Sequence, residues 1–196
     1  MTRLFALALG CLLCGTALST TAIIPQTSPA TTPAMQAPPE VLAAFMKNVD
    51  AYVALHRKAE GTLPRLPDKA TPEQITQSRV ALAALIRAGR PGVPQGNLVT
   101  PDMQAYIRRL MVTVFEGPDG ATLKTTVMEE NPGTLTVKVY DTYPPDVPLT
   151  TMPPAVLAAL PKLPEEIRYG FVGRALVLLD EHADIIVDFV PDAFPG

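Results

Sequence analysis

Residues 167–190 read IRYGFVGRALVLLDEHADIIVDFV, and this stretch decides which fold we expect. Three short apolar runs follow one another, separated first by Gly173 and then by the polar group at 180–184. Short apolar runs with such brief connections are typical of neighbouring strands in an antiparallel sheet. Alternating apolar and polar residues over 135–140 predict one further strand. The sequence therefore predicts a sheet of three to four strands near the C-terminus.

Helix signals occupy the chain before this sheet. Residues 39–60 carry apolar side chains at spacings of three and four, as on one face of an amphipathic helix. Thr71-Pro72-Glu73-Gln74 has the form of a capping box, and Thr100 precedes a helix start of similar design. Weaker signals predict a helix over 121–131 and a short one over 153–160. Helices first and strands second is the α+β pattern, so we expect three or four helices packed on a small antiparallel sheet.

The N-terminus has the pattern of a signal peptide. A positive charge precedes eleven uncharged, mostly apolar residues at 4–14, which is too short a run to span a membrane. Small residues follow where a signal peptidase cuts, and we expect a signal peptide over 1–22 with cleavage after Ala22. Ala17 and Ser19 are alternative cleavage sites. This pattern predicts a secreted or periplasmic protein whose mature chain has no transmembrane span.

Both cysteines, Cys11 and Cys14, fall inside this expected leader. Lipid attachment at Cys11 fits less well than cleavage, because only Gly10 matches the residues that should precede a lipidated cysteine. The mature chain would then contain neither a disulfide nor a thiolate ligand. Residues 23–38 are rich in Pro, Thr and Ala and predict an extended linker, which leaves 39–196 as a single domain.

Composition and charge indicate which classes of partner the protein can bind. The formal net charge is −3, tryptophan is absent, and lysine and arginine form no concentrated stripe. Binding to nucleic acid requires clustered positive charge that neutralises phosphates, so we expect no nucleic-acid partner. A small-molecule ligand or an envelope protein remains as a possible partner.

The densest polar cluster consists of Asp180, His182, Asp184 and Asp188. Carboxylates and an imidazole can ligate a metal ion, so this cluster is a candidate metal site. The same residues are also typical of a hairpin turn, because aspartate side chains bond to nearby backbone N–H groups. We favour the turn, because catalytic zinc sites commonly use two histidines and the chain has only one other, His56.

His56 lies on the apolar face of the helix predicted over 39–60, near its C-terminal end. The simplest interpretation is a partly buried histidine that favours the negative end of the helix dipole. His56 would cooperate with His182 only if the end of this helix met the tip of the hairpin.

Arg168, Arg174 and Tyr169 form a second candidate site, for an anionic ligand. The two arginines lie on or near neighbouring strands, and guanidinium groups bind carboxylates and phosphates. Catalytic residues are harder to find, because the serines beyond the leader, Ser28 and Ser78, lack the setting of a nucleophile. We therefore assign no catalytic residue and no cofactor.

The stretches 169–180 and 185–193 resemble the C-terminal part of exported bacterial proteins of unknown function. The resemblance implies a compact exported domain, with neither an activity nor site residues. Our leading hypothesis is accordingly a non-enzymatic binding or interaction domain. The alternatives are a metal-assisted hydrolase that uses the cluster at 180–188, and a structural component of an envelope assembly.

Overall fold

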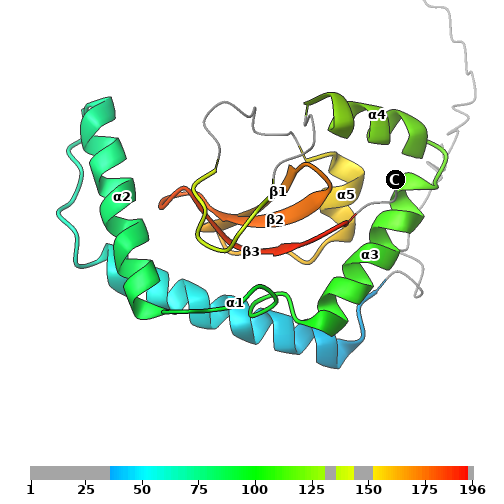
Figure 1. Ribbon diagram of the computed structural model, residues 1–196, viewed down its shortest axis with the longest axis horizontal. Helices are drawn as coiled ribbons and strands as arrows, with labels where there is room; N and C mark the ends of the chain where they lie inside the picture. Colours follow the sequence, from blue (N-terminus) through cyan, green and yellow to red (C-terminus); the bar gives the residue numbers. More distant parts are fainter. Residues whose placement is uncertain (1–35, 131–135, 144–151, 194–196) are drawn as a thin grey trace, which may run out of the picture. The chain divides into compact units, whose positions relative to one another are not determined.

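A computed structural model describes residues 36–130, 136–143 and 152–193, and it confirms the α+β arrangement (Figure 1). The helices are α1 (Pro39–Glu60), α2 (Pro72–Gly89), α3 (Pro101–Phe115), α4 (Gly120–Glu130) and α5 (Pro154–Ala159). The strands are β1 (Ile167–Val172), β2 (Ala175–Asp180) and β3 (Ile185–Val190), which form one antiparallel sheet in the order β1-β2-β3.

The helix starts follow the predicted capping residues. In α2 the Thr71 side chain accepts a hydrogen bond from the Gln74 backbone N–H, and the Gln74 side chain accepts one from the Thr71 N–H. Thr100 caps α3 in the same way by accepting from the Met103 N–H. These bonds satisfy N–H groups that have no partner within the helix, which fixes where each helix begins.

Two tight connections build the sheet. The turn between β1 and β2 contains two residues, and its first, Gly173, has a φ of 57°, a conformation that glycine adopts without strain. The connection between β2 and β3 pairs Asp180 with Ile185, which confirms the predicted hairpin turn over 180–184. A bulge interrupts the register of β2 with β3 next to Leu178, so that Val187 has no partner residue.

The strand predicted over 135–140 is wrong for residues 136–140, which form no strand; residue 135 lies outside the described residues. Asp141 explains the difference, because its carboxylate accepts from the Lys138 N–H and its own N–H donates to the Lys138 carbonyl. Such local bonds favour a turn over a strand. Tyr140 within this turn has a φ of 72°.

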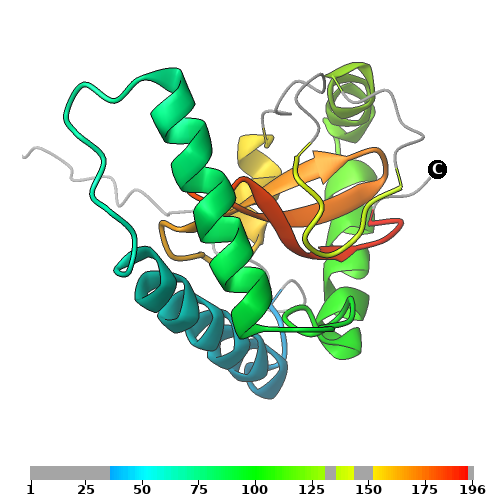
Figure 2. The ribbon, with the colours of Figure 1, turned by 60° about the vertical axis from the view of Figure 1, so that its left-hand side comes forward.

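The helices cover one face of the sheet. Figure 1 shows α1 passing below the sheet, with α2 and α3 at its two ends, and Figure 2 shows the same elements from the side. The main core lies between these helices and the sheet and includes Phe45, Tyr52, Ile107 and Leu176. The opposite face carries a smaller apolar cluster, formed by Tyr143, Val172, Ala175, Val177, Leu179 and Ile186.

The predicted signal peptide, its cleavage sites and all but the last three residues of the predicted linker lie outside the described residues. Within the part that is described, no helix combines the length and the apolar character that a membrane span requires.

Candidate metal centre

The C-terminal half of α1 meets the β2–β3 hairpin and brings distant polar residues together. Tyr52, His56 and Glu60 are four residues apart on α1 and therefore share one face of the helix. Asp180 and His182 come from the hairpin, and the imidazole rings of His56 and His182 lie 5.2 Å apart. The end of α1 thus meets the tip of the β2–β3 hairpin, which is the condition for the two histidines to act together.

Asp180 is fully buried, and both of its carboxylate oxygens are used. Oδ1 accepts hydrogen bonds from the backbone N–H groups of His182 (3.0 Å) and Ala183 (2.8 Å), which begins the hairpin turn. Oδ2 accepts from the Tyr52 hydroxyl and from His56 Nδ1, each at 2.6 Å. Asp180 therefore shapes the turn and also fixes the orientation of the His56 ring.

His56 is fully buried, yet its Nε2 atom has no hydrogen-bond partner. The ionised Asp180 can only accept, so His56 Nδ1 carries a proton, and Nε2 offers a lone pair when the ring is neutral. The nearest acidic oxygen is Glu60 Oε2, at 3.6 Å. Buried polar atoms without a partner are rare in folded proteins, and a metal ion is one of the partners that account for them.

Electrostatics favour an ionised Asp180 and a protonated His56 in the metal-free protein. Burial lowers the pKa of His56, but the hydrogen bond to Asp180 and the negative charges of Asp180, Glu60 and Glu166 outweigh burial, so that the pKa is raised. Burial raises the pKa of Asp180, but hydrogen bonds from His56, Tyr52 and the Ala183 N–H outweigh it, so that the pKa is lowered. The carboxylate is therefore ionised, the charged form of the imidazole is favoured, and a metal ion bound at Nε2 would replace the proton there.

His56, Glu60 and His182 each direct one potential ligand atom toward the same place, and these atoms lie within 4.8 Å of one another. His182 Nδ1 is 2.8 Å from Glu60 Oε1. The ligand atoms of a tetrahedral zinc site lie about 3.3 Å apart, as bond lengths of about 2.0–2.2 Å require. Small side-chain adjustments would therefore complete the geometry, and Glu60 and His182 are each 46% exposed, which gives an ion access.

The four residues of the predicted metal cluster have different places in the structure. His182 belongs to the group of potential ligands, and Asp180 stands behind it as a hydrogen-bond partner of His56. Asp184 occupies the turn with a φ of 53°. Asp188 is fully buried, and its carboxylate accepts from backbone N–H groups, those of Gly96, Leu98, Val99 and Phe189. Asp184 thus occupies the turn, Asp188 binds backbone N–H groups, and the other potential ligands beside His182 are His56 and Glu60.

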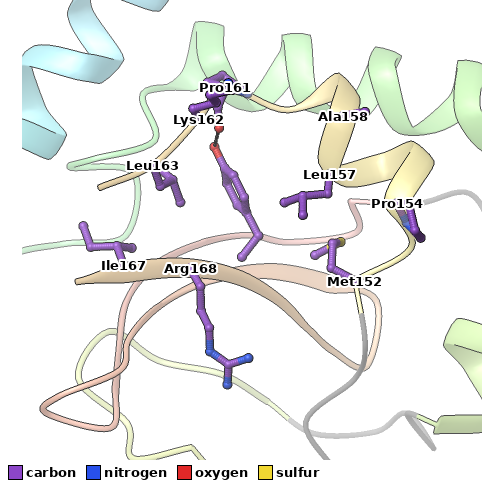
Figure 3. A pocket seen from close by; sticks show the side chains of 10 residues that line it. Met152, Pro154, Leu157, Ala158, Pro161, Lys162, Leu163, Ile167 and Arg168 are labelled. Atoms are coloured by element: carbon purple, nitrogen blue, oxygen red, sulfur yellow. Dashed lines mark hydrogen bonds between the residues drawn. The ribbon is translucent and has the colours of Figure 1, made fainter. Parts of the chain in front are cut away.

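The predicted anion site is not assembled. Arg168 forms an ion pair with Glu181 at 2.6 Å, and Arg174 forms one with Asp192 at 3.3 Å. Tyr169 packs in the main core on one face of the sheet, whereas Arg168, its neighbour along the strand, points to the other face (Figure 3). Since Arg174 lies at the β1–β2 turn, the three side chains do not converge.

Two members of the centre, Tyr52 and Glu60, were missed by sequence reasoning. A signal did exist, because Tyr52, His56 and Glu60 repeat at the helical spacing of four. Comparisons with protein families, with curated proteins and with solved structures found no match. The geometry of this centre is therefore the basis for a function. The resemblance to exported bacterial proteins stays a prediction.

Proposed function

We propose that this protein binds a divalent transition-metal ion, with zinc the best fit, through His56 Nε2, a Glu60 carboxylate oxygen and the His182 imidazole. The observation that carries the proposal is the buried His56 Nε2, which has no hydrogen-bond partner and lies beside two further potential ligands. Two histidines and one glutamate are a ligand set that zinc uses in catalytic sites.

The surroundings of His56 support the same assignment. A histidine that binds a metal through one ring nitrogen usually donates the other N–H to a carboxylate, which fixes the ring and increases its basicity. Asp180 accepts this hydrogen bond from His56, and the Tyr52 hydroxyl and two backbone N–H groups hold Asp180 in turn. Imidazole nitrogen with carboxylate oxygen favours zinc and its neighbours over calcium or magnesium, which prefer oxygen ligands alone.

The test is a calorimetric zinc titration of the purified protein after chelation and dialysis. We expect one zinc ion per chain, with an affinity that falls by about 100-fold in Glu60→Gln and in His182→Gln, since each loses a ligand. Both side chains are half exposed, so both variants should fold. Glu40→Gln, at the opposite end of α1, is the matched control and should bind zinc like the unmodified protein. Equal affinity in all four proteins would refute the proposal.

Metal-assisted hydrolysis is a second candidate function, because the centre has three potential protein ligands. Three protein ligands leave the fourth position of a tetrahedral zinc ion to water, and the exposed edge at Glu60 and His182 would admit a substrate. Zinc lowers the pKa of bound water to about 7, so the resulting hydroxide could attack an ester carbonyl carbon and expel the alcohol.

The hydrolytic function is tested with p-nitrophenyl acetate, which needs no acid to assist its leaving group. We expect the zinc-loaded protein to release nitrophenolate faster than free zinc at the same concentration, and Glu60→Gln to lose the difference. A rate equal to that of free zinc would exclude ester hydrolysis and leave the binding proposal standing.

A further inference from the structure

A second candidate site lies away from the metal centre, in a cavity of about 940 Å³ between α5, the connection after it and β1 (Figure 3). The lining residues are Met152, Pro154, Leu157, Ala158, Pro161, Lys162, Leu163, Ile167, Arg168 and Tyr169. We propose that this cavity binds a monomeric amphiphile, an aliphatic chain that carries an anionic head group. The volume falls in the range of about 300–1,000 Å³ that small-molecule pockets occupy.

The cavity walls are apolar and come from separate parts of the chain. Ile167 and Tyr169 belong to the main core, so the cavity extends the core outward to solvent. Figure 3 shows Leu157 and Met152 next to each other on one side of the cavity, and Leu163 and Ile167 on the other side. Leu157 is 52% exposed, so its side chain is accessible to a ligand that enters the cavity.

The hydroxyl of Tyr169 on the inner wall already has a hydrogen-bond partner. The Tyr169 hydroxyl donates a hydrogen bond to the Pro161 carbonyl, and burial raises the pKa of this hydroxyl, so it stays neutral. At about 30 Å³ per molecule, roughly thirty waters would fill the cavity with few hydrogen-bond partners on its walls. Replacing such water by an aliphatic chain is favourable, because apolar surface leaves contact with water on both sides.

One lysine determines the head group. Lys162 lines the cavity and is exposed, and it forms no ion pair with the described residues. Arg168, the other cation beside the cavity, forms an ion pair with Glu181, which follows the end of β2. A single free ammonium group beside apolar walls complements a chain that ends in a carboxylate or another anion.

The experiment compares dodecanoate with dodecylammonium, both as monomers, by isothermal titration. We expect one dodecanoate per chain and binding of dodecylammonium that is about tenfold weaker, because the head group would face Lys162 with like charge. Leu157→Asp should weaken dodecanoate binding by about tenfold or more, because it places a carboxylate at the apolar wall. Val80→Asp, at a similarly exposed apolar position on α2, should leave the affinity unchanged.

Three further variants distinguish binding in this cavity from binding elsewhere on the chain. Lys162→Glu should abolish the preference for the carboxylate, whereas Lys47→Glu on α1 should keep it. Glu60→Gln should bind dodecanoate normally, so that this site and the metal centre can fail independently. No dodecanoate binding, equal binding of both amphiphiles, or binding to anionic phospholipid vesicles without binding to the monomer would each overturn the proposal.

Discussion

Asp180 uses its two carboxylate oxygens for different purposes. Its local role was predictable, because an aspartate at the start of a short connection bonds to N–H groups two and three residues ahead. Its bond to His56 was not predictable, because that bond joins residues 124 positions apart and depends on how α1 crosses the sheet. The contact of Glu60 with His182 was equally unpredictable, because in the sequence Glu60 is only a charged residue at the end of a helix.

The raised pKa of His56 predicts how the stability of the metal-free protein depends on pH. A histidine whose pKa is raised by folding stabilises the folded state below its ordinary pKa of 6.5, and this contribution is lost as the pH rises through the folded value. Asp180 has a lowered pKa, so its contribution is present above 3.8 and is lost as the pH falls through the folded value.

With a chelator present, the free energy of unfolding should therefore be highest between about pH 4 and 6.5 and should fall toward pH 9. Urea denaturation at pH 5.5 and pH 8.5 measures the alkaline loss. A free energy of unfolding that does not change between these two values would show that the charged His56 does not stabilise the folded protein.

At the level of elements, Asp188 joins β3 to the connection between α2 and α3. Its buried carboxylate accepts from the N–H groups of Gly96, Leu98 and Val99 and so holds residues 96–99 against the sheet. The sequence made Asp188 a candidate metal ligand, because a carboxylate in a polar cluster can either bind a metal ion or accept hydrogen bonds from backbone N–H groups. Only the tertiary structure distinguishes these purposes, since the N–H donors are about ninety residues away.

Asp188→Asn should lower the free energy of unfolding by about 3 kcal/mol, because the amide NH₂ would face N–H donors that it cannot satisfy. Chemical denaturation measures the change. Asp184→Asn is the matched control and should be nearly neutral, because asparagine also tolerates the left-handed conformation at this position. Similar losses in both variants would mean that the bonds to residues 96–99 contribute little.

The elements themselves were largely predictable where their signals are local. The capping residues Thr71 and Thr100 mark the starts of α2 and α3, and Gly173 marks the first hairpin. The prediction over 135–140 failed because alternation alone does not reveal the competing bonds of Asp141. Periodicity shows which residues fit a strand, and the turn-forming side chain beside them decides whether a strand forms.

At the scale of the whole molecule, the candidate metal centre joins α1 to the β2–β3 hairpin. Both cysteines of the chain lie within its first fourteen residues, so the described residues contain no disulfide that could make this connection. An ion bound by His56, Glu60 and His182 would link positions more than 120 residues apart and would stabilise the folded state over the unfolded chain.

Zinc at about 100 times its dissociation constant should add about 2.7 kcal/mol to the free energy of unfolding, which corresponds to a rise in Tm of about 5–10 °C. A thermal melt followed by circular dichroism, with and without zinc, measures this shift. Glu60→Gln should show a much smaller rise at the same zinc concentration. Zinc binding without any rise in Tm would mean that the unfolded chain binds the ion equally well.

The bulge in β3 has a consequence for the whole C-terminal segment. Side chains alternate between the two faces of a regular strand, so Ile185 and Asp188 would point in opposite directions if Val187 were paired. The additional residue resets this alternation, and both residues can face the helices. Losing or gaining one amino acid at this point would turn Asp188 toward the opposite face of the sheet and release the loop that it holds, whereas a change of side chain at Val187 would leave the number of residues unchanged.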